Sequence, residues 1–111
     1  MVTGRRGELW TAAGGGRITS KPRPVLIIQS DLFAGSDYVT VAPITTTDVD
    51  SPTRVPLPAT QATGVVDPSY VMTDKLHTIP RTNLGKQIGV APTSAMVGVE
   101  RAILVFLGMA D

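Results

Sequence analysis

Short apolar stretches separated by glycine and proline predict a protein built mainly from β-strands. The stretch PVLIIQ at 24–29 is almost continuously apolar, which is typical of a strand buried on both faces. The stretch YVTVAPIT at 38–45 alternates valine with threonine, as a half-buried strand does. A polar connection, DLFAGSD, joins the two stretches, so we expect them to form a hairpin.

Further short strands are predicted on both sides of this hairpin, and their prolines mark strand starts or edges, where a missing N–H is tolerated. These segments are GELW at 7–10, TRVPL at 53–57, VDPSYVMT at 66–73 and KQIGV at 86–90. Between the first strand and Arg23, the stretch TAAGGGRITSK has three glycines and no packing pattern, which predicts a mobile surface loop. Its glycines lack the trailing Lys-Ser/Thr of a phosphate-binding loop.

From Thr93 onward the apolar residues recur at helical spacing. We expect Thr93 to cap the N-terminus of a helix and Gly108 to close it. The predicted apolar face comprises Met96, Val99, Ile103, Leu104 and Leu107. These elements predict an α+β fold, a small barrel-like domain of about five strands with one C-terminal helix. No repeat or linker interrupts the chain, so we expect one domain over residues 1–111.

Composition narrows the class of protein. The chain has 111 residues and is 42% hydrophobic, enough for one modest core. Ten Lys and Arg against nine Asp and Glu leave a net charge of +1, so affinity for a polyanion would require local clustering of charge. The absence of cysteine removes disulfides and thiolate chemistry. Without a signal-like start or an apolar run near about 20 residues, we expect a cytoplasmic protein with no membrane partner.

The inventory of reactive groups excludes several mechanisms. His77 is the only histidine, so paired imidazoles cannot act within one chain, and no GxSxG motif supports a Ser-His-Asp site. Asp48 and Asp50 lie two apart in a polar stretch, which favours a solvated turn over a cation site. We therefore predict neither a metal nor a cofactor.

Basic and hydroxyl groups gather at the ends of the two central predicted strands. Pro22 and Pro24 restrict the backbone around Arg23, so its side chain should leave the strand in a defined direction. If the strands pair, Arg23 comes near Thr45, a plausible phosphate site. On residue types alone, a surface ion pair for Arg23 and a polar turn for the threonines are the more ordinary interpretations. The full set is Arg17, Lys21, Arg23, Thr45, Thr46 and Thr47.

Four segments in order, RRGELW, KPRPVLIIQSD, VAPITT and TDKLHTIPRTNLGKQIG, resemble the signature of the MazF/PemK family of toxins from type II toxin-antitoxin systems. The resemblance extends from Arg6 to the C-terminal helix. It implies a small SH3-like β-barrel of the CcdB/PemK type that forms a homodimer. It also implies a metal-independent endoribonuclease of the mRNA interferase type, acting on single-stranded RNA and neutralised by a cognate antitoxin.

The family's catalytic arginine falls on Arg23 and its catalytic threonine on Thr45. By this resemblance the RNA 2′-hydroxyl attacks the adjacent phosphorus, giving a 2′,3′-cyclic phosphate and a 5′-hydroxyl. Arg23 would then neutralise the phosphorane and Thr45 would bind a non-bridging oxygen. Candidate substrate-binding residues are Arg17, Lys21, Thr46, Thr47, Asp74, Lys75 and His77.

The chain departs from the family pattern in two places. Many members carry an acidic residue shortly before the Arg-Pro, where this chain reads GGGRITSK. Asp74-Lys75 stands where Glu-Gln or Asp-Gln is common, and His77 stands where Arg or Lys is common. His77 could shuttle a proton or be a structural residue at a strand end, so the general base and acid stay open.

Two other functions remain possible for such a barrel. A gyrase-poisoning toxin similar to CcdB would end its helix in Trp-Gly-Ile, whereas this chain ends GMAD. A binding module would dock RNA without cutting it, but two Phe, two Tyr and one Trp are few for a stacking platform. An antitoxin segment should be acidic where it meets Lys21, Arg23 and Lys75.

Overall fold

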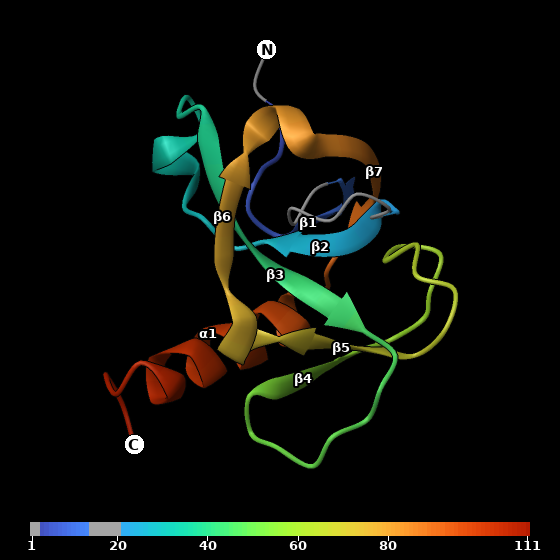
Figure 1. Cartoon of the computed structure of the whole chain (residues 1–111). Helices are drawn as coiled ribbons and strands as arrows, with labels where there is room; N and C mark the ends of the chain where they lie inside the picture. The colour runs from blue at the N-terminus through green and yellow to red at the C-terminus, as the bar shows by residue number, and fades with distance from the viewer. Residues whose placement is uncertain (1–2, 14–20) are drawn as a thin grey trace.

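The computed structural model describes residues 3–13 and 21–111. Within these ranges the chain forms seven strands, three short 3-10 helices and one α-helix (Figure 1). The strands are β1 (Glu8–Ala12), β2 (Arg23–Ile27), β3 (Tyr38–Thr45), β4 (Arg54–Leu57), β5 (Ser69–Met72), β6 (His77–Pro80) and β7 (Leu84–Val90). The helices are η1 (Asp31–Phe33), η2 (Thr73–Lys75), η3 (Arg81–Asn83) and α1 (Thr93–Phe106).

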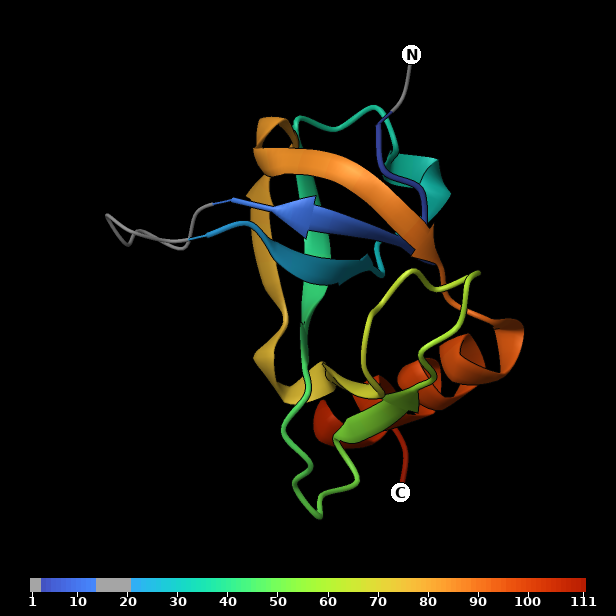
Figure 2. The same cartoon turned by 90° about the vertical axis from the view of Figure 1, so that its right-hand side faces the viewer.

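All the strands join one antiparallel sheet in the order β4-β5-β3-β2-β1-β7, with β6 added beside β3. The long strand β3 makes this possible, because its first half pairs with β6 and its end pairs with β5. The sheet curves around the centre of the molecule without closing (Figures 1 and 2). The predicted barrel-like α+β fold with a C-terminal helix is confirmed.

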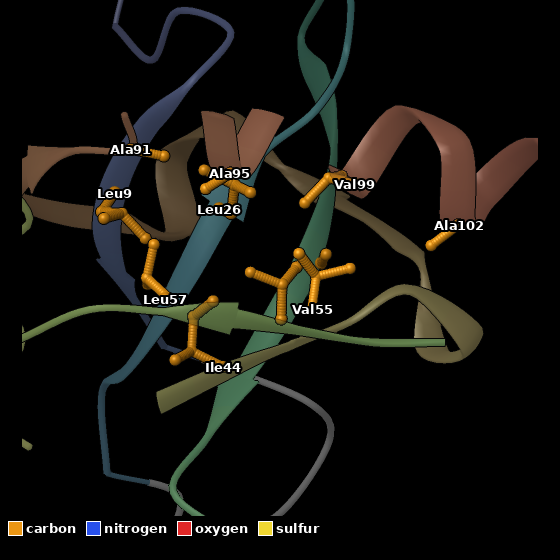
Figure 3. Packing of buried hydrophobic residues seen from close by; sticks show 11 residues of the cluster. Leu9, Leu26, Ile44, Val55, Leu57, Ala91, Ala95, Val99 and Ala102 are labelled. Atoms are coloured by element: carbon orange, nitrogen blue, oxygen red, sulfur yellow. The ribbon is translucent and has the colours of Figure 1, made fainter. Parts of the chain in front are cut away.

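The central strands supply two hydrophobic clusters because successive side chains point to opposite faces. On β2, Leu26 enters the larger cluster, whereas Val25 and Ile27 enter the smaller one. The larger cluster joins the sheet to α1 through Val99 and two helical alanines, Ala95 and Ala102 (Figure 3). The prediction that β2 is buried on both faces is confirmed.

The terminal helix differs in detail from the prediction. Thr93 is its first residue and not its cap, because Pro92 occupies the N-cap position without a side-chain hydrogen bond. Gly108 closes the helix as predicted, with a φ of +76° that favours glycine. Its N–H donates to the Val105 carbonyl at 3.0 Å, and the Met109 N–H donates to the Leu104 carbonyl at 2.8 Å.

The helical face that packs on the sheet differs from the prediction in its last turn, although Val99 is buried and Met96 and Ile103 pack against the larger cluster as expected. Ala95, Val99 and Ala102 are buried, but Leu104 and Leu107 are 41% and 55% exposed. Small residues lie at the contact, so the helix can approach the sheet closely. The larger apolar side chains of its last turn are left at the surface.

Three strand assignments needed correction. β1 runs on to Ala12, into the predicted loop, because Thr11 and Ala12 pair with Pro24 and Arg23 of β2. The rest of that loop, residues 14–20, lies outside the described residues. β6 was missed because HTIP is short and ends in proline; it pairs with β3 and buries Ile79 in the smaller cluster. β5 begins at Ser69, so the segment VDP before it is loop.

In the described ranges, no helix has the length and apolar character to cross a membrane.

Candidate active site

The start of β2 and the end of β3 lie side by side, as the predicted hairpin requires. Val25 pairs with Pro43, and Ile27 pairs with Val41. This pairing ends at Val25 and Pro43, and Arg23 and Thr45 are the terminal residues of the two strands just beyond it. In Figure 1 both strand ends lie on the right of the molecule, next to the yellow-green segment that precedes β5.

A groove of about 480 Å³ opens at these strand ends. Its floor and walls come from β1, β2, β3, β7 and the segment 64–69. Arg23 and Thr45 both line it, so the structure brings the two candidate catalytic residues together. The remaining lining residues are Thr11, Pro24, Ile44, Thr46, Thr47, Gly64, Val65, Val66, Asp67, Ser69 and Ile88.

Arg23 has a fixed backbone and an unengaged side chain. Its backbone is paired with Ala12 of β1, and Pro24 follows it. The side chain is exposed, and its guanidinium makes no hydrogen bond or ion pair to any residue in the described ranges. All five of its N–H donors are therefore available to an anion in the groove.

Thr45 is oriented by its own strand end. Its Oγ1 accepts a hydrogen bond from the Thr47 backbone N–H at 3.1 Å. The Thr45 hydroxyl uses one of its acceptor sites for the Thr47 N–H. Its single hydrogen remains available to donate to a substrate oxygen. Thr45 is half-buried and pairs with Tyr70 of β5, which restricts its movement.

The structure separates Asp74 from this groove. Its carboxylate accepts a hydrogen bond from Arg54 Nε at 3.3 Å, an ion pair that ties β4 to η2. Burial would raise the pKa of Asp74, but its own backbone N–H, Arg54 and the charge of Lys75 together hold that pKa below its ordinary value. The carboxylate is thus occupied within the fold.

The other candidates lie at varying distances from the groove. Lys75 and His77 are exposed, and neither lines the groove. His77 pairs with Val41, four residues before Thr45 on β3, which is roughly 13 Å along the strand. Lys21 is exposed just before β2 and outside the lining, whereas Thr46 and Thr47 are inside it. Arg17 lies outside the described residues.

The carboxylate of Glu8 is engaged within the fold. It accepts hydrogen bonds from the Arg5 N–H at 2.8 Å and from Trp10 Nε1 at 3.0 Å. Among the described residues, no cluster of three or more His, Cys, Asp or Glu side chains is placed to hold a metal.

Sequence reasoning missed the wall of the groove formed by Val65, Val66 and Asp67. The stretch VDPSYVMT was interpreted as a strand, and nothing in its apolar pattern indicates that its first residues turn toward β2 and β3. Thr11 and Ile88 were missed for the same reason, because their position in the groove depends on how β1 and β7 pair.

An arginine with unengaged donors and several hydroxyls around an open groove make a site suited to the phosphate groups of a larger substrate. A family model for the PemK-like, MazF-like toxin of type II toxin-antitoxin systems matches residues 5–107, and the chain belongs to this family. The resemblance found in the sequence is thereby confirmed.

Relatives extend this comparison. The chain is 49% identical over 107 residues to the probable endoribonuclease MazF of Mycolicibacterium smegmatis, covering 96% of this chain and 98% of that protein. It superposes on the Mycobacterium tuberculosis toxin MazF-mt6 with a TM-score of 0.80 at 35% identity, covering 94% and 98% of the two chains. A structure of MazE-MazF from Deinococcus radiodurans gives a TM-score of 0.79 at 25% identity, covering 98% and 99%.

Proposed function

We propose that this chain is an endoribonuclease toxin that cleaves single-stranded RNA at specific sequences without a metal, and that a cognate antitoxin neutralises it. The 2′-hydroxyl of the RNA attacks the adjacent phosphorus, leaving a 2′,3′-cyclic phosphate on one fragment and a 5′-hydroxyl on the other. The observation that carries the proposal is that Arg23 and Thr45 line one groove with the guanidinium unengaged. The endoribonuclease names of the relatives support it.

Arg23 stabilises the charge that develops during this reaction. The phosphorane carries more negative charge than the phosphodiester, and preorganised donors aimed at that charge lower the barrier. The guanidinium is planar and stays protonated, so it can hold two phosphate oxygens at once. Its backbone is fixed by Ala12 and the neighbouring prolines, so little reorganisation is needed.

Thr45 donates its hydroxyl hydrogen to a non-bridging oxygen of the same phosphate. The Thr47 N–H already occupies an acceptor site of its Oγ1, which fixes the direction of the remaining hydrogen. Thr46 and Thr47 continue the hydroxyl lining and can contact the flanking backbone of the RNA.

The partners of the active form are a second copy of the chain and an acidic antitoxin segment. The end of α1 leaves an apolar surface for a homodimer to cover, formed by Val97, Leu104, Val105, Phe106, Leu107 and Met109. The MazE-MazF structure of the Deinococcus radiodurans relative supports an antitoxin partner. We expect light scattering at micromolar concentration to give twice the monomer mass; a monomer in active preparations would contradict the dimer.

One experiment separates the candidate functions. The protein is incubated with a long RNA in EDTA, beside Arg23→Ala and a control, Arg5→Ala, whose exposed side chain lies outside the groove lining and outside the proposed dimer surface. We expect discrete fragments with 5′-hydroxyl ends from the parent and from Arg5→Ala, and almost none from Arg23→Ala. RNA that is bound and left whole would identify a binding module, and loss of gyrase supercoiling without RNA fragments would identify a gyrase poison.

A further inference from the structure

The segment between β4 and β5 is held in place by an internal network. Thr63 is fully buried, and its Oγ1 donates to the Pro58 carbonyl at 2.7 Å and accepts from the Thr60 N–H at 3.1 Å. The Thr63 N–H donates in turn to Thr60 Oγ1 at 3.1 Å. A buried hydroxyl with this many partners fixes the loop around it.

The same segment rests directly on the backbone of β7. The Val90 N–H donates to the Ala62 carbonyl at 2.8 Å. A Cβ added at Gly64 would lie 1.9 Å from the Ile88 carbonyl oxygen, and one added at Gly89 would lie 2.2 Å from the Thr63 carbonyl oxygen. Gly64 also has a φ of +74°. Only glycine permits this approach of backbone to backbone, so the segment forms a rigid wall (Figure 2, yellow-green).

The wall presents Val66 and Asp67 to the groove. Val66 is 91% exposed, which is unusual for a large apolar side chain and leaves its face open to a ligand. The Asp67 carbonyl accepts a hydrogen bond from Ser69 Oγ at 2.7 Å, and Pro68 restricts the Asp67 backbone. The Asp67 backbone is therefore restricted beside the groove, and its exposed carboxylate makes no hydrogen bond or ion pair within the described residues.

Asp67 and Arg23 are the only charged residues among those that line the groove in the described structure. They form no ion pair there, so the groove has a cationic end and an anionic end. A phosphate is attracted to the first and repelled by the second. An RNA strand in the groove must therefore present something other than phosphate to Asp67.

We propose that Asp67 selects a nucleobase carrying an exocyclic amino group at a position beside the scissile phosphate, an inference that rests on the proposed function. A carboxylate only accepts hydrogen bonds. Cytosine N4, adenine N6 and guanine N2 offer amino donors, and guanine adds its neighbouring N1–H for the second carboxylate oxygen. Uracil has a carbonyl oxygen on each side of its one N–H, and these oxygens are repelled by the oxygens of the carboxylate. Val66 packs against the face of the selected base.

The test uses pairs of substrates that differ only at the amino group. Cleavage sites are first mapped on a random-sequence RNA by sequencing the fragment ends. The best site is then synthesised with cytosine or uracil, with adenine or purine, and with guanine or inosine, at each position flanking the cut. Wild type, Asp67→Asn and a control, Asp48→Asn, which changes an exposed carboxylate outside the lining, are compared on all of them.

We expect wild type and Asp48→Asn to cut the amino-bearing member of at least one pair roughly 5- to 100-fold faster, as a specific base contact provides. In Asp67→Asn this ratio should fall to near one. No preference in wild type, or a preference that survives in Asp67→Asn, overturns the inference; the wild-type comparison requires no variant to fold. If Asp67→Asn cut all substrates equally slowly and lost the acidic limb of the pH-rate profile, Asp67 would be a proton acceptor. That result would also overturn the inference. Absence of any cleavage by wild type would instead refute the proposed function.

Discussion

Two cavities of this protein each contain an arginine, and the two arginines are used in opposite ways. The cavity beside η3 is the larger, at about 590 Å³, and contains Arg81. Its guanidinium donates to the carbonyls of Ser36 at 2.7 Å, Thr3 at 2.5 Å, Gly4 at 3.0 Å and Tyr38 at 3.4 Å. The groove at β2 and β3 is smaller, about 480 Å³, and its Arg23 is engaged by no described residue.

This difference shows that the availability of donors, and not the size of a cavity, marks the candidate active site. Arg81 connects the N-terminal segment to the loop before β3, so its hydrogen bonds contribute to the fold. Within the described residues the donors of Arg23 have no partner, which is what binding a substrate anion requires. The comparison can be tested by replacing each arginine in turn and measuring both RNA cleavage and the free energy of unfolding.

The largest effect on activity should follow from Arg23→Ala. Removing one preorganised donor from a developing charge typically costs about 10² to 10³ in rate. We expect cleavage of a fluorescent RNA to fall by that factor while the urea denaturation midpoint stays unchanged. Arg23→Lys keeps the charge but loses the planar fork, so it should recover only part of the rate. Full activity in folded Arg23→Ala would refute the assignment.

The opposite result is expected for Arg81→Ala. Loss of hydrogen bonds from a charged group to several carbonyls should lower the free energy of unfolding by about 1 to 3 kcal/mol. Urea denaturation measures this loss, and cleavage per folded molecule should remain near the parental rate. If Arg81→Ala were inactive and as stable as the parent, the distinction between the two arginines would be lost.

A smaller effect on activity is expected at Thr45. Thr45→Ala removes one hydrogen-bond donor to the phosphate and should slow cleavage by about tenfold. Thr45→Ser keeps the hydroxyl that accepts from Thr47, so it should retain most of the rate. Single-turnover cleavage is the measurement. Equal rates for the two variants would show that the hydroxyl takes no part.

The smallest effect concerns a third arginine, which the fold pairs with a carboxylate. The pKa of Asp74 is lowered in the folded state, so its pair with Arg54 stabilises the protein above the unfolded pKa near 3.8. That contribution is lost as the pH falls through the lowered folded pKa. The difference in free energy of unfolding between wild type and Asp74→Asn should be about 1 kcal/mol or less at pH 6 and shrink toward pH 3. If the difference in free energy of unfolding did not change with pH, packing and not the ion pair would be its cause.

Local patterns predicted much of this molecule. The alternation of 38–45 matches β3 residue for residue, and the glycine after the helical segment closes α1 as expected. The hairpin of β2 and β3 then placed Arg23 near Thr45, since antiparallel neighbours bring a start and an end together. The proximity of the two candidates therefore followed from two adjacent strands, whereas their catalytic roles rest on the family resemblance.

Features that depend on distant segments could not be predicted in this way. β6 exists because β3 is long enough to pair with it, and HTIP alone has too little strand character. The helix buries alanines and exposes Leu104 and Leu107, because close approach to the sheet selects small side chains over large ones. The separation of Asp74, Lys75 and His77 from the groove reflects where η2 and β6 lie beside β3.

The sequence was sufficient for the strands with strong patterns, the end of the helix, the family and the arginine-threonine pair, because these depend on neighbours along the chain. Only the tertiary structure decided that Asp67 and Val66 form a wall of the groove, and that Arg81, unlike Arg23, hydrogen-bonds to other described residues. The physical reason is that both results depend on backbone groups contributed from remote segments. The carbonyls of Thr3 and Gly4 in the N-terminal segment accept hydrogen bonds from Arg81. Gly64 lies so close to the Ile88 carbonyl that a Cβ would not fit.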